Sequence, residues 1–160
     1  MVIDKEGFRA NVGIVLINNK RQVLLCKRVG LADAWQFPQG GIHQGESVTQ
    51  AMYRELTEEL GLRQDDVAVL AESKNWLRYW LPKHLRRYHV KPLCVGQKQK
   101  WFLLRLLSSE ASILFTMTDH PEFDEGAWVD YWYPAQKVIA FKRRVYKKML
   151  QEFESVIFET

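Results

Sequence analysis

A helix with one acidic face is encoded in residues 40–62, where the chain reads GGIHQGESVTQAMYRELTEELGL. Ser47 followed three residues later by Gln50 is a capping-box signature, and Gly61 suits the left-handed position that ends many helices. No proline interrupts the segment. The sequence therefore predicts a helix of about four turns over Ser47–Leu60.

The predicted helix separates apolar from acidic side chains, because each residue turns it by about 100°. The apolar stripe contains Val48, Met52, Leu56 and Leu60, and the adjoining stripe contains Glu55, Glu58 and Glu59 above the small Ala51. Like charges on Glu55 and Glu59, at i and i+4, cost roughly 0.2–0.5 kcal/mol, and they lie near the negative end of the helix dipole. A divalent cation removes that repulsion, and ligands that are all oxygen suit Mg²⁺ or Mn²⁺.

Two interpretations of this acidic face follow from the residues alone. It is either a metal site or a solvated helix face on which Arg54 pairs with Glu58 at i, i+4, and charge patterns more often mark solvated faces. The flanking residues favour the metal site. The segment resembles the signature of the Nudix hydrolase superfamily at every fixed position: Gly, five residues, Glu, seven residues, Arg-Glu-apolar-any-Glu-Glu-any-Gly-apolar.

The resemblance implies a role for each fixed residue of the segment. Gly40 and Gly41 form a turn that carries the chain across the mouth of the active site, and Arg54 orients the carboxylates. Glu46 either caps the helix or holds Arg54. The metal is bound by Glu55, Glu58 and Glu59. Members of the superfamily hydrolyse a nucleoside diphosphate linked to another moiety.

The similarity extends beyond this segment, from about Gly7 to Phe158. The chain resembles the bacterial RNA pyrophosphohydrolases, which overlap with the dinucleoside polyphosphate hydrolases, in the motifs WQFPQGGI, AMYREL, NWLRYWLPK, GQKQKWFLL, PEFD and YWYP followed by FKRRVY. The resemblance implies a single Nudix hydrolase domain over residues 1–160. Such an enzyme removes pyrophosphate from triphosphorylated RNA 5′ ends and leaves a monophosphate, which initiates mRNA decay.

The same resemblance assigns residues outside the helix. Glu122, in PEFD, is the additional acid that completes the metal site, with an ordinary loop acid as the alternative. The basic residues expected near the substrate phosphates and nucleotide are Arg9, Arg28 and Lys142, each of which would otherwise be read as a surface cation. A base pocket is expected to contain Ile139, Phe141 and Lys142, whereas periodicity alone places Phe141 at the entry of the last helix.

The acidic cluster suits the hydrolysis of phosphoanhydrides. This reaction requires a neutralised polyphosphate, a positioned water and a stabilised leaving phosphate, and clustered Mg²⁺ ions serve all three needs, with Mn²⁺ as a substitute. We expect Glu55 and Glu59 to bind metal directly. Glu58 is either a third ligand or the base that deprotonates the attacking water, and the sequence leaves both roles open.

Positive charge is concentrated in one part of the chain. From Ser73 through Ser109 there is no Asp or Glu, while lysines and arginines are interleaved with Trp76, Tyr79, Trp80, Tyr88 and Trp101. Cations neutralise RNA phosphates, and exposed aromatic rings stack on unpaired bases. We therefore expect contacts to 5′-phosphorylated RNA, and none to DNA, from Tyr79, Arg86 and Arg87. The alternative is that the tryptophans belong to core strands and the cations to a solvated loop.

The composition is that of an ordinary globular domain. The chain is 47% hydrophobic and 26% charged with a net charge of +4, which suits one domain with a full core. It has no apolar run of about 18 residues and no signal peptide, so we expect a cytoplasmic protein. Cys26 and Cys94 lack the spacing of a zinc site or disulfide framework and are expected to be buried thiols. A monomer is the default expectation, and the sequence does not identify an activating protein partner.

Strand and helix patterns predict an α/β architecture. Apolar segments at Asn11–Ile17 and Gln22–Arg28 predict a hairpin, and a helix over Phe141–Phe158 has one apolar and one basic face. Further strands are expected at Val67–Ser73, Gln99–Leu107 and Gly126–Trp132, and a loop at Lys83–Gln97. The Nudix resemblance implies that these elements form a mixed β-sheet sandwiched between helices.

Three functions are compatible with these residues. The first is RNA 5′ pyrophosphohydrolase. The second is hydrolysis of dinucleoside polyphosphates of the Ap4A or Ap5A type, or of free nucleotides, because the same carboxylate and metal site would cut those. The third, a non-catalytic RNA-binding regulator, is disfavoured because Glu55, Glu58 and Glu59 are all present.

Overall fold

The computed structural model describes residues 2–158, so Met1, Glu159 and Thr160 of the predicted domain lie outside the described residues. The strands are β1 (Phe8–Ile17), β2 (Val23–Arg28), β3 (Trp35–Gln36), β4 (Gln39–Gly41), β5 (Val67–Glu72), β6 (Leu77–Trp80), β7 (Gly96–Leu106) and β8 (Phe123–Val129). The α-helices are α1 (Val48–Leu60), α2 (Tyr133–Lys137) and α3 (Arg143–Phe158). Short 3₁₀ turns are η1 (Gln64–Asp66), η2 (Lys83–Leu85), η3 (Glu110–Ser112) and η4 (Ala140–Lys142).

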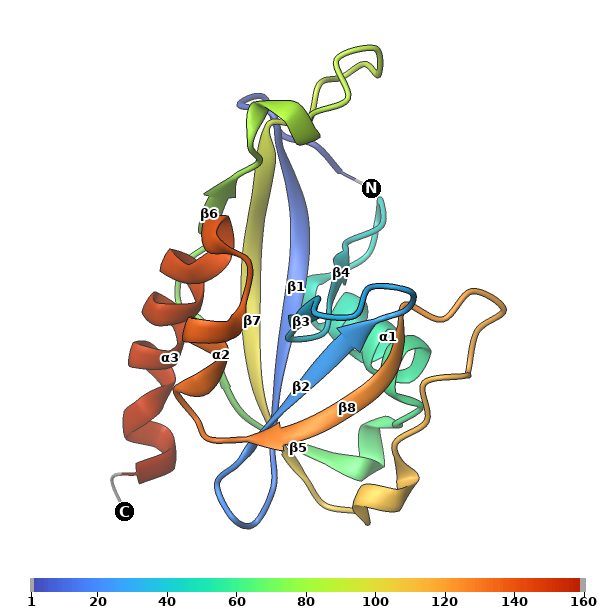
Figure 1. Cartoon of the computed structure of the whole chain (residues 1–160), viewed down its shortest axis with the longest axis vertical. Coiled ribbons are helices and arrows are strands. Elements are labelled where there is room, and N and C mark those ends of the chain that lie inside the picture. Colours follow the sequence, from blue (N-terminus) through green and yellow to red (C-terminus); the bar gives the residue numbers. More distant parts are fainter. Residues whose placement is uncertain (1, 159–160) are drawn as a thin grey trace.

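The sheet is mixed, as expected. Its centre is the long parallel pair of β1 and β7, which runs in register from Phe8 opposite Gly96 to Ile17 opposite Arg105. All other neighbours are antiparallel: β4 pairs with β1, and β5 and β6 pair with β7. The predicted hairpin is present, but β2 pairs with β1 only at its base and then leaves to pair with β3 and β8. In Figure 1, β2 and β8 cross in front of the central pair.

Two hydrophobic clusters cover the two faces of the central strands. Successive side chains of a strand point to opposite faces, so alternate residues of β1 and β7 enter different clusters. On one face, α1 packs with Met52, Leu56 and Leu60 against Val12, Ile14, Leu16, Phe102 and Leu104. On the other face, α3 packs with Val145, Met149, Phe153 and Ile157 against Val15, Ile17, Trp101 and Leu103. The helices therefore enclose the sheet from both sides, with α1 opposite α2 and α3 (Figure 1), which is the predicted sandwich.

The predicted boundaries of α1 are confirmed. Ser47 accepts a hydrogen bond from the Gln50 amide at 3.1 Å, and the Gln50 side chain accepts one from the Ser47 amide at 2.9 Å. Gly61 adopts a left-handed φ of 68° and ends the helix. Local capping chemistry thus sets both ends of the helix that carries the acidic residues.

Other boundaries differ from the prediction. β7 begins three residues earlier than expected, at Gly96. β8 covers Phe123–Val129 instead of Gly126–Trp132, and α3 begins at Arg143 because the residues before it form η4. Four short elements, β3, β4, β6 and α2, were not predicted, because they span five residues or fewer and carry little periodic signal.

The turn predicted at Gly40 and Gly41 is wrong. Both residues belong to β4, where Gly40 pairs with Val12 and Gly41 with Asn11 of β1. The expectation for the cysteines is also half wrong, since Cys26 is buried but Cys94 is only half-buried. Among residues 2–158, no helix is long and apolar enough to cross a membrane.

Candidate active site

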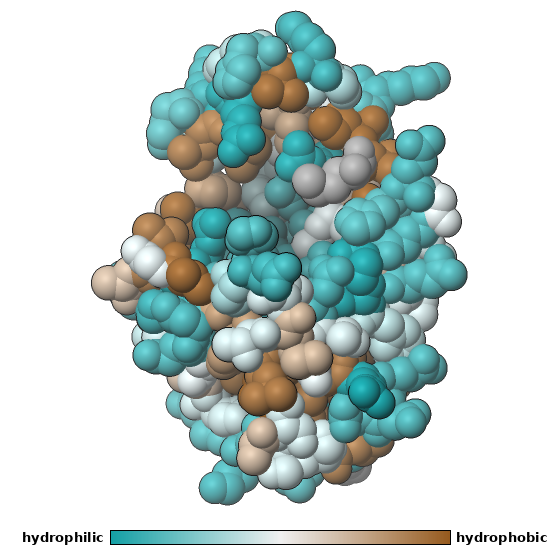
Figure 2. Space-filling model, turned by 90° about the vertical axis from the view of Figure 1, so that its right-hand side faces the viewer, coloured by the Kyte–Doolittle hydropathy of each residue, from teal (hydrophilic) through white to brown (hydrophobic). Residues whose placement is uncertain are grey.

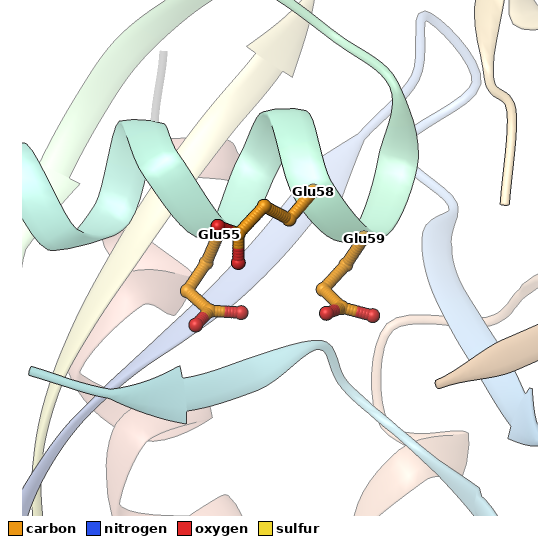
Figure 3. Close-up of side chains that lie close together, drawn as sticks. All are labelled: Glu55, Glu58 and Glu59. Carbon is orange, nitrogen blue, oxygen red and sulfur yellow. The ribbon is translucent and has the colours of Figure 1, made fainter. Parts of the chain in front are cut away.

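Three glutamates of α1 form one compact cluster. Each of Glu55, Glu58 and Glu59 offers a carboxylate oxygen, and these oxygens lie within 4.8 Å of one another. Glu55 is buried, and the other two are half-buried. Figure 3 shows the Glu55 and Glu59 carboxylates below the helix and the Glu58 side chain lying across the helix, with its carboxylate above that of Glu55. The structure thus brings together the three residues predicted to bind metal.

All three nitrogens of the Arg54 guanidinium donate hydrogen bonds that hold this cluster in place. Its Nε and Nη2 donate to the two carboxylate oxygens of Glu46 at 2.7 and 3.0 Å, and Nη2 also donates to the Gly41 carbonyl at 2.7 Å. Its Nη1 donates to Glu55 at 2.8 Å and to Glu58 at 3.2 Å. Glu46 therefore holds Arg54, while the helix cap is Ser47, and the two alternatives for Glu46 are resolved.

The pKa of Glu46 and the pKa values of Glu55 and Glu59 shift in opposite directions. Hydrogen bonds from Arg54 lower the pKa of Glu46 to about 2. Burial raises the pKa of Glu55 to about 7, against the opposing effect of Arg54, and burial together with the charges of Glu122 and Glu55 raises the pKa of Glu59 to about 7. Carboxylates that are crowded and buried disfavour ionisation. A hard divalent cation offsets this, so the donor set fits Mg²⁺ or a similar ion.

The protein without metal is expected to become less stable as the pH rises from about 6 to about 8. The folded-state pKa values of Glu55 and Glu59, about 7, lie above the ordinary value of 4.5. The folded state therefore binds protons more tightly, so the free energy of unfolding falls as the pH rises through this interval. Thermal melts in a chelator should show a lower melting temperature at the higher pH, and added Mg²⁺ should restore it.

A double variant, Glu55→Gln with Glu59→Gln, serves as the control for this prediction. It removes both titrations, so its melting temperature should change less between the two pH values than that of the native protein. A metal-free protein whose stability rises with pH over the same interval would contradict the assignment of the two raised pKa values.

Gly40 lies directly against the Glu55 carboxylate. A Cβ atom added at Gly40 would overlap the carboxylate carbon and both oxygens of Glu55. β4 therefore passes beneath the acidic cluster with no side chain between the strand backbone and Glu55, and Figure 3 shows a strand in this place. Glycine is required here for close approach and not for a turn.

Glu122 lies between the acidic cluster and a group of basic residues. It precedes β8, and its carbonyl accepts a hydrogen bond from the Val29 amide at 2.9 Å. Its charge raises the pKa of Glu55 and Glu59, while burial raises its own pKa against the charges of Arg28 and Lys142. Glu122 is not one of the three residues whose oxygens lie within 4.8 Å of one another. Its predicted place in the metal site stays a prediction, supported by these couplings.

One cavity of about 520 Å³ is lined by four of the predicted substrate residues, which are Arg28, Ile139, Phe141 and Lys142. Trp35, Leu85 and neighbouring residues complete its wall. They come from the end of β2 and from the segment between α2 and α3. Ile139 is exposed, Phe141 is half-buried and packs on the Tyr79 ring at 5.7 Å between centroids, and Lys142 is buried. The tertiary structure thus places Arg28 on the same cavity as Ile139, Phe141 and Lys142, and their role as a base pocket stays a prediction.

The ammonium group of Lys142 lies among buried amide side chains. Its Nζ donates to the side-chain carbonyls of Gln36 at 3.3 Å and Gln39 at 3.4 Å. Burial, with the charge of Arg28, lowers the pKa of Lys142 to about 8, while Glu122 opposes that shift. The ammonium group is therefore held in place by two amides next to the acidic cluster.

A chain of buried amides behind Lys142 was missed by sequence reasoning. Gln99 donates to Asn11 at 2.8 Å and to Gln39 at 3.2 Å, and Gln39 donates to the Tyr79 hydroxyl at 3.3 Å. The only signal in the sequence is Asn11, a polar residue inside a mainly apolar strand, whereas Gln99 lies in the polar stretch Gln97–Lys100 and does not stand out. Buried polar groups are nearly always hydrogen-bonded, so these amides fix β1, β4 and β7 relative to one another.

Arg9 does not line the cavity that contains Arg28 and Lys142. Arg9 and Arg87 line a second cavity of about 390 Å³, which also contains Leu85 and Gln97. Leu85 borders both cavities, so they adjoin. Arg86 is half-buried, and its Nε donates to the Leu81 carbonyl at 3.0 Å, so it also stabilises the loop. Tyr79 is 4% exposed, and its predicted contact with RNA stays a prediction.

The aromatic residues of the basic segment divide into core and surface. Trp101 is fully buried in the core, which matches the alternative interpretation for that residue. Trp80 is 59% exposed and Tyr88 is 53% exposed, whereas Trp76 is half-buried beneath Lys98 and Lys100. Seen from the α1 side, the molecule has a recess in its upper half that is bordered by both hydrophilic and hydrophobic residues (Figure 2).

The comparisons with known proteins agree with the fold and the acidic cluster described above. Residues 7–153 match the sequence model of the NUDIX domain. An RNA pyrophosphohydrolase of Haemophilus influenzae is 57% identical over 157 residues, which cover 98% of this chain and 80% of the relative. An RNA pyrophosphohydrolase of Salmonella arizonae is 55% identical over 156 residues, 98% of this chain and 88% of the relative.

Two solved structures share the fold at low sequence identity. The E. coli dihydroneopterin triphosphate pyrophosphohydrolase superimposes with a TM-score of 0.71 at 21% identity, over 91% of this chain and 98% of that chain. A C. elegans Ap4A hydrolase in a binary complex superimposes with a TM-score of 0.64 at 17% identity, again over 91% and 98%.

Proposed function

Because this chain belongs to the NUDIX domain family, we propose that it is an RNA 5′ pyrophosphohydrolase, which converts the 5′ triphosphate of RNA to a monophosphate and releases pyrophosphate. Relatives that carry this name align with nearly the whole chain. The structural observation behind the proposal is the glutamate cluster held by Arg54, next to a cavity with Arg28 and Lys142 on its wall.

A divalent metal cofactor follows from the family, and we propose that it is Mg²⁺, with Mn²⁺ as a substitute. Glu55, Glu58 and Glu59 would hold the ion, and Glu122 would contribute from the loop before β8. When bound, the metal neutralises the polyphosphate and activates water for attack on phosphorus. Arg54 keeps two of the carboxylates aimed at one point, because its Nη1 donates to both Glu55 and Glu58.

We assign the remaining groups to substrate binding and proton transfer. Glu58 is the more exposed partner of Arg54, with its side chain 41% exposed against 8% for Glu55. It can therefore act as a third ligand or accept the proton of the attacking water. Arg28 and Lys142 would bind the substrate phosphates, while Ile139 and Phe141 offer an apolar wall and a ring against which an RNA base can pack.

We also propose that residues 1–160 form a single domain, that the enzyme is monomeric and that it acts on RNA in the cytoplasm, as the sequence predicts. Hydrolysis of dinucleoside polyphosphates stays the alternative activity, because the same carboxylates would serve it.

Incubation of triphosphorylated RNA, diadenosine polyphosphate and free nucleotide with the protein and Mg²⁺ tests the proposal. RNA should be cut with the highest kcat/KM. A higher value for diadenosine polyphosphate would contradict the proposal, and no cleavage of any substrate would favour a non-catalytic RNA-binding protein.

Phe141→Ala is expected to raise the KM for triphosphorylated RNA about tenfold, because stacking on one base contributes roughly 1–3 kcal/mol. The metal dependence should be unchanged, since the carboxylates lie on a different helix. The alternative is that Phe141 chiefly anchors α3, since it also packs on Tyr79 and the adjacent core. Kinetics and thermal melts on the same variant distinguish the two roles.

Leu70→Ala is the matched control for this variant. Leu70 is also partly buried against the same hydrophobic cluster, but it lies on β5 and lines neither cavity described above. It should lower the melting temperature without changing KM. If Phe141→Ala behaves in the same way, with a large loss of stability and a normal KM for the folded fraction, the base-pocket role is wrong.

A further inference from the structure

A buried chain of hydrogen bonds ends at the ammonium group of Lys142. The acceptors at this end are the side-chain carbonyls of Gln36 and Gln39. An ammonium group has three N–H donors, and among residues 2–158 the Lys142 nitrogen has no other acceptor and no ion pair. The third N–H is therefore available to a phosphate oxygen of a substrate in the cavity that Lys142 lines.

The orientation of the Gln39 amide decides whether Gln39 can hold this cation. Its carbonyl oxygen accepts hydrogen bonds from Lys142 at 3.4 Å and from the Gln99 amide at 3.2 Å. Its own NH₂ group donates to the Tyr79 hydroxyl at 3.3 Å. If the Gln39 amide were turned over, its NH₂ group would face the donors of Lys142 and Gln99. These neighbours therefore require the Gln39 carbonyl to face Lys142.

Gln99 is too deeply buried to touch a substrate. It is 1% exposed and its partner Asn11 is 3% exposed. Neither residue lines the cavity that contains Lys142 or the cavity that contains Arg9. The NH₂ group of Gln99 donates to Asn11 at 2.8 Å and to Gln39 at 3.2 Å. An effect of Gln99 on substrate binding would therefore pass through Gln39 to Lys142.

β4 lies between Lys142 and the glutamate cluster. Successive residues of a strand point to opposite faces, so Gln39 and Gly40 face different sides of β4. Gly40 lies against the Glu55 carboxylate on one side, and Gln39 reaches Lys142 on the other. The Gln39 amide therefore ties the Lys142 ammonium group to the same strand on which Glu55 packs.

We propose that Gln99 is a positioning residue: acting through Gln39, it holds the Lys142 ammonium group where that group binds a substrate phosphate. This role rests on the proposed function, in which Lys142 contacts the phosphates of RNA. Members of a buried polar network support one another, so loss of the Gln99 amide should loosen the Gln39 amide and then Lys142.

Gln99→Met keeps the length of the side chain and removes its hydrogen bonds. The KM for triphosphorylated RNA should rise about threefold or more, with a smaller change in kcat because the glutamate cluster is unaltered. Lys142→Met should raise the same KM about tenfold. Adding Gln99→Met to Lys142→Met should change KM no further, because the group through which Gln99 acts is already gone. Equal increases in both backgrounds would overturn the proposal.

Ser73→Ala is the matched control. Ser73 is 2% exposed, and its hydroxyl also makes two hydrogen bonds, from the Trp101 amide at 3.0 Å and to the Asn75 carbonyl at 3.2 Å. It lines neither the cavity of Lys142 nor that of Arg9. This variant should lower the melting temperature and leave KM unchanged for the folded protein. A Gln99→Met variant that does the same would overturn the proposal.

Crystal structures of the native protein and of Gln99→Met, both without substrate, separate this inference from the proposed function. In the variant, the Lys142 nitrogen should move away from Gln39 or lose a defined position. If it does so but the native protein cuts no triphosphorylated RNA, the proposed activity fails and the positioning role stands. If Lys142 is unmoved while the native protein cuts triphosphorylated RNA, the positioning role fails and the activity stands.

Discussion

Replacing Glu55 by glutamine is expected to lower the turnover of triphosphorylated RNA by at least about a hundredfold, or about 2.7 kcal/mol of transition-state stabilisation. Glutamine keeps the size of the side chain and its carbonyl oxygen can still accept the hydrogen bond from Arg54. It removes the negative charge that binds metal, and loss of one metal ligand costs several kcal/mol. Steady-state kinetics over a range of Mg²⁺ concentrations measure the effect.

The fold of the Glu55→Gln variant should be intact. Without metal, its melting temperature should equal or slightly exceed that of the native protein, because a buried carboxylate and its repulsion with Glu59 are both removed. Near-normal turnover at saturating Mg²⁺ would show that Glu55 is not a metal ligand. A strongly lowered melting temperature would instead assign Glu55 a structural role through Arg54.

Gly40→Ala is expected to reduce turnover by about a hundredfold while the protein stays folded. The added methyl group would overlap the Glu55 carboxylate and displace it from its position beside Arg54. Displacing a catalytic group by about 1 Å can cost about a hundredfold in rate. The atoms that must move are the end of a side chain and not backbone, so the loss should appear in kcat and in the Mg²⁺ requirement more than in stability.

Gly126→Ala is the matched control, because Gly126 is also a strand glycine with a close neighbour. Its added methyl group would lie 2.9 Å from the Phe115 ring and 3.1 Å from Leu24, and no glutamate is among its nearest neighbours. This variant should lose stability and keep its turnover per folded molecule. If Gly40→Ala retains native turnover and the same Mg²⁺ requirement, close packing of β4 on Glu55 is not needed for activity.

The sequence by itself determined the acidic helix and the apolar central strands. The capping residues Ser47, Gln50 and Gly61 and the i, i+4 spacing of the glutamates act within one helix, so local physics encodes them. The apolar face of α3 is likewise a periodic signal, and the apolar runs of β1 and β7 indicate strands. The resemblance to a known family then predicted Glu122 and the substrate residues, which no periodicity indicates.

The tertiary structure alone decided what lies next to the acidic cluster. Gly40 belongs to a strand against Glu55 and not to a turn, and this depends on the pairing of β4 with β1, which no local pattern specifies. The amides of Gln39 and Gln99 meet only because β4 and β7 flank the same strand. Likewise, Phe141 packs on the Tyr79 ring because the turn η4 lies beside β6. Such contacts depend on long-range strand register and helix packing, which are set by the whole core and not by neighbours in the chain.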